Sequence, residues 1–159
     1  MGMSQRMQSF VLDASQNPFN VLEPGKRPRA TLTPAMALKD GKPWLSFSIQ
    51  GGDYQEQNLL QMLLNMHHHG MTVQEAAEAA NFWSFQFRNS FDDHRAVPGR
   101  ILLNSETPTW VVEELEERGY DVITRARTSG PLMGIEIDHA RGIFMGGASN
   151  QGDDYGLAW

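Results

Sequence analysis

The chain has 159 residues, of which 40% are hydrophobic and 20% charged, a composition ordinary for one domain with a single core over residues 1–159. The formal net charge of −6 argues against nucleic acid as a partner, because nucleic-acid binders usually present basic patches. No apolar run approaches the roughly 20 residues that span a bilayer, no signal-peptide pattern is visible, and the absence of cysteine excludes disulfides and thiolate metal sites.

The first thirty residues are rich in turn formers. Asn17-Pro18, Pro24-Gly25 and Arg27-Pro28 favour turns, while residues 7–12 have the composition of a short strand. We therefore expect residues 1–30 to form an extended arm that lies on the body of the domain.

Residues 35–49 predict a β-hairpin. The runs at 35–39 and 44–49 are strand-like, and Asp40-Gly41 between them favours a tight turn with positive φ. The second run ends at Gly51-Gly52, where two glycines let another group come close to the backbone N–H groups. Such a corner can bind an anion, although a plain tight turn before a helix explains the same spacing.

Two capping-box spacings predict the starts of two helices. Asp53 with Glu56 opens the first, which is apolar on most faces and is expected to lie buried against the sheet until Gly70 ends it. Thr72 with Glu75 opens the second, whose alanines suit close packing.

The remaining pattern predicts a third helix and three strands. The helix begins at Thr107-Pro108, with proline at its first position, and ends at Gly119. Strands are expected at 120–124, 134–138 and 142–145, the last two joined by a turn. No βαβ alternation is evident, so this order indicates an α+β fold with a mostly antiparallel sheet covered by helices.

Three polar clusters are candidates for chemistry. His67-His68-His69 cannot all face one ion, because consecutive helical residues point about 100° apart, and no metal site is expected. Asp92-Asp93-His94 is better explained as a solvated loop. Lys26-Arg27-Pro28-Arg29 is either a carboxylate-binding segment or a surface strand with solvated charges.

A series of motifs resembles, in order and spacing, the small subunit of gamma-glutamyltransferases, and the similarity extends from about Gln5 to Trp159. The motifs are Pro24-Gly25-Lys26-Arg27-Pro28, Thr33-Pro34, Leu38-Lys39-Asp40-Gly41-Lys42-Pro43, Gly51-Gly52, Leu60-Gln61-Met62-Leu63-Leu64-Asn65, Gly70-Met71 with Gln74-Glu75-Ala76, Leu115-Glu116-Glu117-Arg118-Gly119-Tyr120 and Gly146-Gly147-Ala148-Ser149. Each motif alone is weak, but the ordered set is specific.

The resemblance implies part of an N-terminal nucleophile hydrolase, an αββα sandwich whose precursor cuts itself to free a threonine that attacks an amide. The free amine of that threonine serves as the base for its own hydroxyl. Gly51 and Gly52 would give their N–H groups to the oxyanion, and Ala30 and Thr31 would line the substrate. The implied partners are the upstream segment and large subunit of the same precursor and a small amide or gamma-glutamyl-like substrate; no cofactor is implied.

Several positions depart from the family pattern. No threonine of this sequence has the context of the family nucleophile, which lies upstream of the segment at 24–28. Ala30-Thr31 stand where the family commonly has two serines, and Ser9 stands where an acidic residue holds the α-ammonium of the donor. Asn150-Gln151-Gly152 replace an Asp-Pro-Arg. These changes favour the acylase-like branch, which prefers an acyl group without a free α-amine.

Two functions remain open. In the first, the chain is the C-terminal part of a gamma-glutamyltransferase-like acyltransferase or amidase, with the nucleophile upstream, and is inactive alone. In the second, it is a non-catalytic remnant or binding domain that uses the same fold to pack on a partner. Either way a missing layer leaves apolar surface open, so self-association or an exposed patch is expected.

Overall fold

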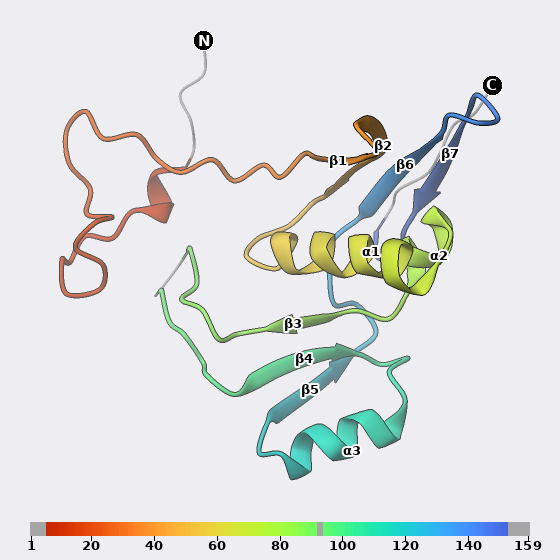
Figure 1. The fold of residues 1–159 in the computed structure, drawn as a ribbon. Coiled ribbons are helices and arrows are strands. Elements are labelled where there is room, and N and C mark those ends of the chain that lie inside the picture. The colour runs from red at the N-terminus through yellow and green to blue at the C-terminus, as the bar shows by residue number, and fades with distance from the viewer. Residues whose placement is uncertain (1–5, 92–93, 153–159) are drawn as a thin grey trace.

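The computed structural model describes residues 6–91 and 94–152, and these form two sheets and three α-helices (Figure 1). The larger sheet is antiparallel, in the order β1-β2-β6-β7, with β1 at Ala35–Lys39, β2 at Lys42–Ile49, β6 at Leu132–Asp138 and β7 at Ile143–Ala148. The smaller sheet has the order β3-β4-β5, with β3 at Phe82–Ser84, β4 at Arg100–Asn104 and β5 at Asp121–Arg125. The expected α+β class, with a mostly antiparallel sheet, is confirmed.

The hairpin of β1 and β2 forms as predicted. Asp40 and Gly41 both have positive φ, of 52° and 76°, which matches the twist of the flanking strands. Ala37 pairs with Leu45 and Leu38 with Pro43, so Trp44 is the extra residue of a β-bulge. The bulge brings the Trp44 Nε1 within 3.0 Å of the Glu136 Oε1, to which it donates.

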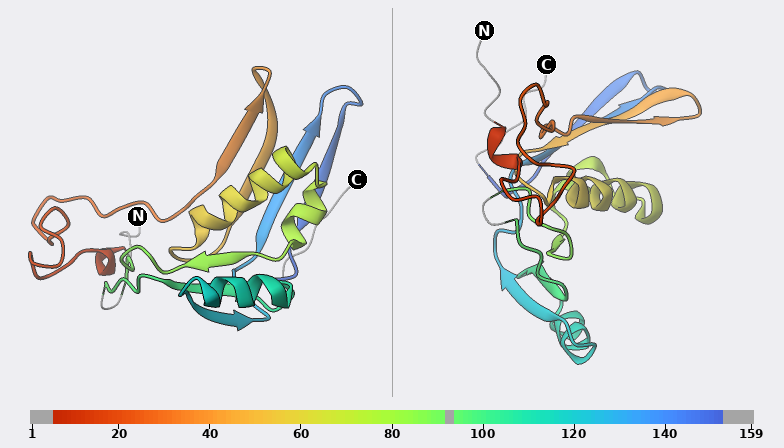
Figure 2. Two further views of the ribbon diagram at one scale, coloured as in Figure 1. Left: turned by 60° about the horizontal axis from the view of Figure 1, so that its bottom comes forward. Right: turned by 90° about the vertical axis from the view of Figure 1, so that its left-hand side faces the viewer.

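Two helices, α1 at Gln55–His69 and α2 at Val73–Glu78, lie on one face of the larger sheet (Figure 2). The core between them contains Leu45, Phe47, Ile49, Leu59, Met62, Met66, Val73, Ala76, Ala77 and Leu132. A Cβ at Gly147 would lie 2.6 Å from the Val73 backbone, so this glycine permits close packing of α2 on the sheet. Helix α1 buries one face and not most of them, since Leu60 is 55% exposed.

The predicted start of α2 is correct, whereas the predicted start of α1 is not. Gly70 ends α1 in the left-handed conformation, and Thr72 and Glu75 form the predicted capping box of α2. The predicted box at Asp53 is wrong: Tyr54 is the N-cap residue of α1 and no side chain caps it. Asp53 instead accepts from the Ser90 backbone N–H at 2.6 Å, so a tertiary partner replaces the local one.

The smaller sheet corrects the expectation that no βαβ unit exists. β4, α3 at Thr109–Glu117 and β5 follow one another in the chain, and β4 and β5 are parallel. Neither β3 nor β4 was predicted, because β3 has three residues and the short apolar run of β4 has no helical or alternating period. Pro108 is the N-cap of α3 and not its first helical residue.

The arm preceding β1 differs from the expected strand at 7–12. Met7–Ser9 form a short 3-10 helix. The Ser9 Oγ donates to the Arg6 carbonyl at 2.7 Å, so the hydrogen-bond partner of this side chain lies within the same turn. Phe10 and Val11 are buried, and Val11 forms an isolated bridge with Val21. In Figure 1 the chain from this helix to β1 runs as an extended, looping segment.

The second face of the larger sheet carries no helix in the described structure (Figure 2). The pairings place Met36, Ser46 and Ile135 in one row across this face, opposite the row of Ala37, Leu45 and Glu136. We call this surface the open face. Its exposed apolar side chains are Met36, Leu38, Met133, Ile135 and Phe144. The expected exposed apolar surface lies here.

Candidate active site

The Gly51-Gly52 corner joins the end of β2 to the start of α1. The Gly52 carbonyl accepts from the Gln55 N–H at 3.1 Å, which starts the turn into the helix. Within the part of the chain that the structure describes, the N–H groups of Gly51 and Gly52 have no hydrogen-bond acceptor. Two adjacent free donors before the N-terminus of a 15-residue helix can stabilise a developing negative charge.

Close backbone contacts hold this corner in place. The Gln50 N–H donates to the Pro131 carbonyl at 3.0 Å, and the Gln55 Nε2 donates to the Ile49 carbonyl at 2.9 Å. Gly130 packs so tightly that a Cβ there would lie 2.1 Å from the Gln50 carbonyl oxygen. The corner is therefore held by contacts with the end of β2 and with the loop before β6.

A buried polar network supports the loop that carries Gly130. The Gln151 Oε1 accepts from the backbone N–H groups of Thr128 and Ser129 at 3.0 and 3.4 Å. Asn81 Nδ2 donates to the Ser129 Oγ at 3.2 Å, and the Thr128 hydroxyl donates to the Asn81 side chain. All four residues are buried. Gln151 lies in the segment that replaces the Asp-Pro-Arg of the family, and its side chain holds this loop.

A bridge through Ser90 connects the arm to the corner. The Arg29 guanidinium donates to the Ser90 Oγ, and the Ser90 N–H donates to the Asp53 carboxylate directly after Gly52. Ser90 is buried, although it lies in a polar stretch without any pattern that pointed to it. The bridge thus links the residue before Ala30 to the residue after Gly52.

The expected substrate residues have different surroundings. The Thr31 hydroxyl accepts from the Arg6 side chain, while Ala30 is exposed. Ser9 is 1% exposed, and its hydroxyl donates to the Arg6 carbonyl, so this side chain is both uncharged and buried away from a ligand. In the described part of the chain no hydrogen bond joins Ala30 or Thr31 directly to Gly51 or Gly52.

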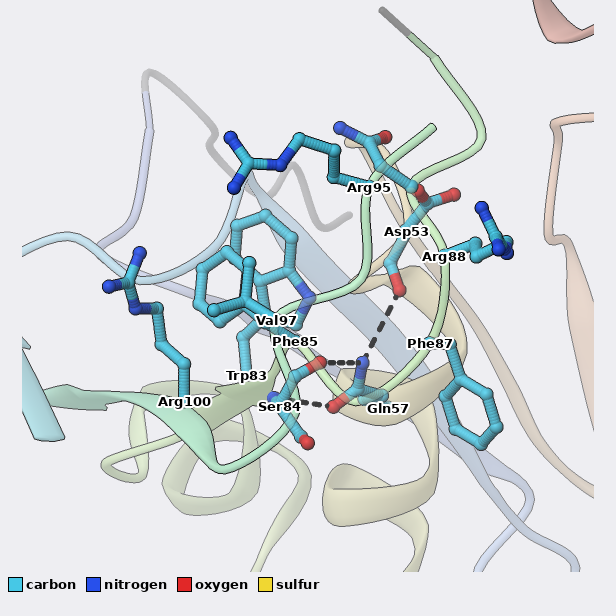
Figure 3. Close-up of a pocket in the computed structure, with 11 residues that line it drawn as sticks. Asp53, Gln57, Trp83, Ser84, Phe85, Phe87, Arg88, Arg95, Val97 and Arg100 are labelled. Atoms are coloured by element: carbon cyan, nitrogen blue, oxygen red, sulfur yellow. Dashed lines mark hydrogen bonds between the residues drawn. The ribbon is translucent and has the colours of Figure 1, made fainter. Parts of the chain in front are cut away.

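An open pocket of about 290 Å³ lies beside the corner (Figure 3). Its lining comes from the start of α1, from β3 and from the segment up to Arg100: Asp53, Gln57, Trp83, Ser84, Phe85, Phe87, Arg88, Asn89, Arg95, Val97 and Arg100. The Gln57 side chain donates to the Ser84 carbonyl at 3.1 Å and accepts from the Ser84 N–H at 2.8 Å, so both its polar atoms have protein partners.

The other polar clusters have structural explanations where they are described. Among residues 6–91 and 94–152, no group of three or more His, Asp or Glu could hold a metal ion. The His67 ring lies 6.3 Å from that of Trp44 in an edge arrangement. His94 is buried, while Asp92 and Asp93 lie outside the described residues. Lys26 lies 3.6 Å from Glu23. None of the described helices has the length and apolar character to cross a membrane.

Comparison with known sequences identifies relatives of this chain. Residues 2–159 match the gamma-glutamyltranspeptidase family. The glutathione hydrolase-like YwrD proenzyme of Bacillus subtilis is 32% identical over 156 residues, covering 95% of this chain and 28% of the relative. The acylase ACY 1 proenzyme of Pseudomonas sp. strain SE83 is 28% identical over 139 residues, covering 86% of this chain and 23% of the relative. The chain thus spans less than a third of the length of these curated relatives.

Solved structures show the same fold. The cephalosporin acylase of Bacillus halodurans superposes with a TM-score of 0.81 and 26% identity, covering all of this chain and 28% of that protein. Gamma-glutamyltranspeptidase from Pseudomonas nitroreducens superposes with a TM-score of 0.77 and 20% identity, covering 99% of this chain and 81% of that chain. The N-terminal nucleophile hydrolase fold is therefore confirmed, and this chain belongs to the gamma-glutamyltranspeptidase family.

Proposed function

We propose that this chain is the C-terminal part of a gamma-glutamyltransferase-like acyltransferase or amidase and supplies its oxyanion hole. The observation that carries the proposal is the pair of free N–H groups at Gly51 and Gly52. When a threonine hydroxyl attacks the substrate carbonyl, negative charge develops on the carbonyl oxygen. Two fixed donors stabilise that charge more than they stabilise the neutral carbonyl, which lowers the barrier.

In this proposal the attacking threonine comes from a preceding segment of the same precursor. The amine of that threonine takes the hydroxyl proton while the threonine oxygen bonds to the carbonyl carbon. The C–N bond then breaks, the departing amine takes up that proton, and an acyl ester remains on the threonine. Water or an acceptor amine then attacks the acyl ester and releases the threonine. The hydroxyls of Thr31 and Thr128 in this chain have Arg6 and Asn81 as partners, and neither threonine has the sequence context of the family nucleophile.

We further propose that the rest of the precursor, including its large subunit, covers the open face. Apolar side chains at this face, such as Phe144 at 73% exposure, have a higher free energy in water than when buried, so packing against a second sheet would be favourable. A double variant, Ile135→Glu with Phe144→Glu, should stop the chain from co-purifying with the remainder of the precursor when both are co-expressed. The control Trp110→Glu, exposed on α3, should leave co-purification intact. Loss of co-purification in both variants, or in neither, contradicts this role of the open face.

The oxyanion role is tested by two substitutions at Gly52 in the complete enzyme. Gly52→Pro removes the N–H group, whereas Gly52→Ala keeps it, and no atom of the described residues lies within 4 Å of the alanine Cβ. The proline variant should lose roughly 10²–10³ in kcat, the range typical of a lost oxyanion donor. The alanine variant should stay within a few-fold of the parent. Equal activities of the two variants would contradict the proposal.

The alternative is a non-catalytic remnant or binding domain that packs on a partner, and the open face is the observation that favours it. The two functions differ in what the complete precursor does. We expect the 159-residue chain alone not to turn over a gamma-glutamyl anilide. The processed precursor should turn it over. Turnover by the chain alone, or a processed precursor without any activity on amides, contradicts the enzymatic proposal.

A further inference from the structure

The pocket of Figure 3 combines two features that recognise one kind of chemical group, and it begins at the residue after Gly52. One wall is aromatic and the rim is rich in arginine. We propose that this pocket binds a planar anionic group, an aromatic carboxylate. The proposal rests on the proposed function only in assigning this group to the acyl part of the amide substrate; the binding itself requires no catalysis.

A row of aromatic rings leads from the corner into the pocket. Tyr54 covers Gly51, since a Cβ on Gly51 would lie 2.1 Å from the Tyr54 ring. The Tyr54 and Trp83 rings meet edge to face at 5.3 Å, and Trp83 and Phe85 stack at 4.1 Å with an interplanar angle of 30°. A flat ring extends such a row by stacking or by an edge contact, so the pocket wall favours an aromatic ligand.

Three of the residues that line the pocket are arginines. Arg88, Arg95 and Arg100 line it, and among the described lining residues Asp53 carries the opposite charge; Arg100 also pairs with Asp121. Such a local concentration of positive charge attracts anions and disfavours ammonium groups. Figure 3 shows Arg95 and Arg100 on the side of the ring pair and Arg88 on the opposite side.

The arginines can make specific contacts with a carboxylate as well as attract it. Arg100 donates to Asp121 through Nε and Nη2, both at 2.7 Å, which leaves further N–H groups of its five for a ligand. Guanidinium groups pair with carboxylates in a two-pronged geometry and also lie flat on aromatic rings. The Gln57 amide is occupied by Ser84, so rings and guanidinium groups determine what binds.

Three small probes separate the contributions of ring and charge. Isothermal titration of the 159-residue chain with benzoate should give saturable binding. Benzamide has the ring without the charge, and cyclohexanecarboxylate has the charge without the flat ring. Both should bind several-fold more weakly than benzoate. Equal binding of either probe and benzoate overturns the proposal.

A pair of double variants separates this pocket from general surface charge. Arg88→Gln with Arg95→Gln should weaken benzoate binding tenfold or more, since each lost charged hydrogen bond has a large effect. The control, Arg118→Gln with Arg141→Gln, makes the same change in net charge at exposed residues outside the pocket and should leave binding unchanged. If the pocket double variant has an altered circular dichroism spectrum, Arg88→Gln alone, at an exposed residue, replaces it.

Absence of saturable benzoate binding, or equal weakening by both double variants, overturns the pocket proposal. The outcome is independent of the proposed function, because no nucleophile takes part in the titration. Benzoate binding with an inactive complete precursor would retain the pocket and reject the oxyanion role. An active precursor whose isolated chain does not bind benzoate would retain the oxyanion role and reject the pocket proposal.

Discussion

The backbone N–H of Gln50 donates to the carbonyl oxygen of Pro131 at 3.0 Å, and this bond joins the residue before Gly51 to the loop before β6. The two segments are far apart in sequence, yet Gly130 lies directly against the Gln50 carbonyl. The position of the two free N–H groups therefore depends on a glycine about eighty residues away, which the polar network around Gln151 holds.

Gly130→Ala should displace the corner. The added Cβ would lie 2.1 Å from a backbone oxygen, which cannot move aside like the end of a flexible side chain. We expect a loss of unfolding free energy of about 1–3 kcal/mol, and in the complete enzyme a lower kcat. Denaturant unfolding and steady-state kinetics measure both effects. Gly146→Ala is the control, because within the described part of the chain its Cβ would meet no atom within 4 Å. Equal losses in the two variants would show that Gly130 has no special role.

Asp53→Ala should loosen the Ser90 bridge and leave the start of α1 unchanged. The substitution removes the acceptor of the buried Ser90 N–H, which costs about 1–3 kcal/mol when the donor stays unpaired. Asp53→Asn keeps a side-chain oxygen and should cost less. Hydrogen exchange distinguishes the sites: faster exchange is expected at Ser90. Faster exchange confined to the first turn of α1 would instead restore the capping role that the structure does not show.

The capping box of α2 should make stability depend on pH in the acidic range. The Thr72 backbone N–H, and then its hydroxyl, hold the pKa of Glu75 below its ordinary value of 4.5. Because the pKa is lower in the folded state, this contribution is present above 4.5 and is lost as pH falls through the lowered value. The Tm difference between the parent and Glu75→Gln should therefore shrink on acidification. Glu78→Gln, in the same helix, is the control, and a Tm difference for Glu75→Gln that grows toward acidic pH contradicts the linkage.

The parts of the fold that sequence predicted are those whose determinants are local. Asp40-Gly41 sets its own turn, and Thr72 and Glu75 complete each other within one helical turn. β3 escaped prediction because three residues become a strand only through pairing with β4, whose own partner β5 lies beyond a helix. Asp53 has the correct spacing for a cap, but a partner 37 residues away takes its carboxylate.

The same distinction applies to the candidate site. Adjacent glycines between a strand and a helix are visible in sequence at Gly51-Gly52, but their spacing also fits a plain tight turn, and their oxyanion role comes from the resemblance to gamma-glutamyltransferases and stays a prediction. Ser90, Gly130 and Gln151 could not be predicted, since each acts through contacts between distant segments. The pocket was missed for the same reason: its arginines and aromatic residues become neighbours only when β3 and the following segment lie beside the start of α1.

The complete enzyme should prefer a glutaryl amide to glutathione. Ser9 is neutral, buried and bound to the Arg6 carbonyl, and the Arg6 side chain places positive charge at Thr31, where a donor ammonium would be disfavoured. Loss of two charged hydrogen bonds could weaken gamma-glutamyl binding roughly a hundredfold. The ratio of kcat/KM for the two substrates measures this preference, and Arg6→Gln should reduce it. A clear preference for glutathione would show that Ser9, Arg6 and Ala30 do not determine the acyl group.

The most direct test of the oxyanion role is a structure of the complete, processed enzyme with an alkyl boronate bound to its catalytic threonine. The boronate becomes tetrahedral on the threonine oxygen and imitates the charged intermediate. We expect one boronate oxygen to lie roughly 2.7–3.1 Å from the backbone nitrogens of both Gly51 and Gly52. A boronate whose oxygens all lie away from these nitrogens, with both N–H groups still free, would contradict it.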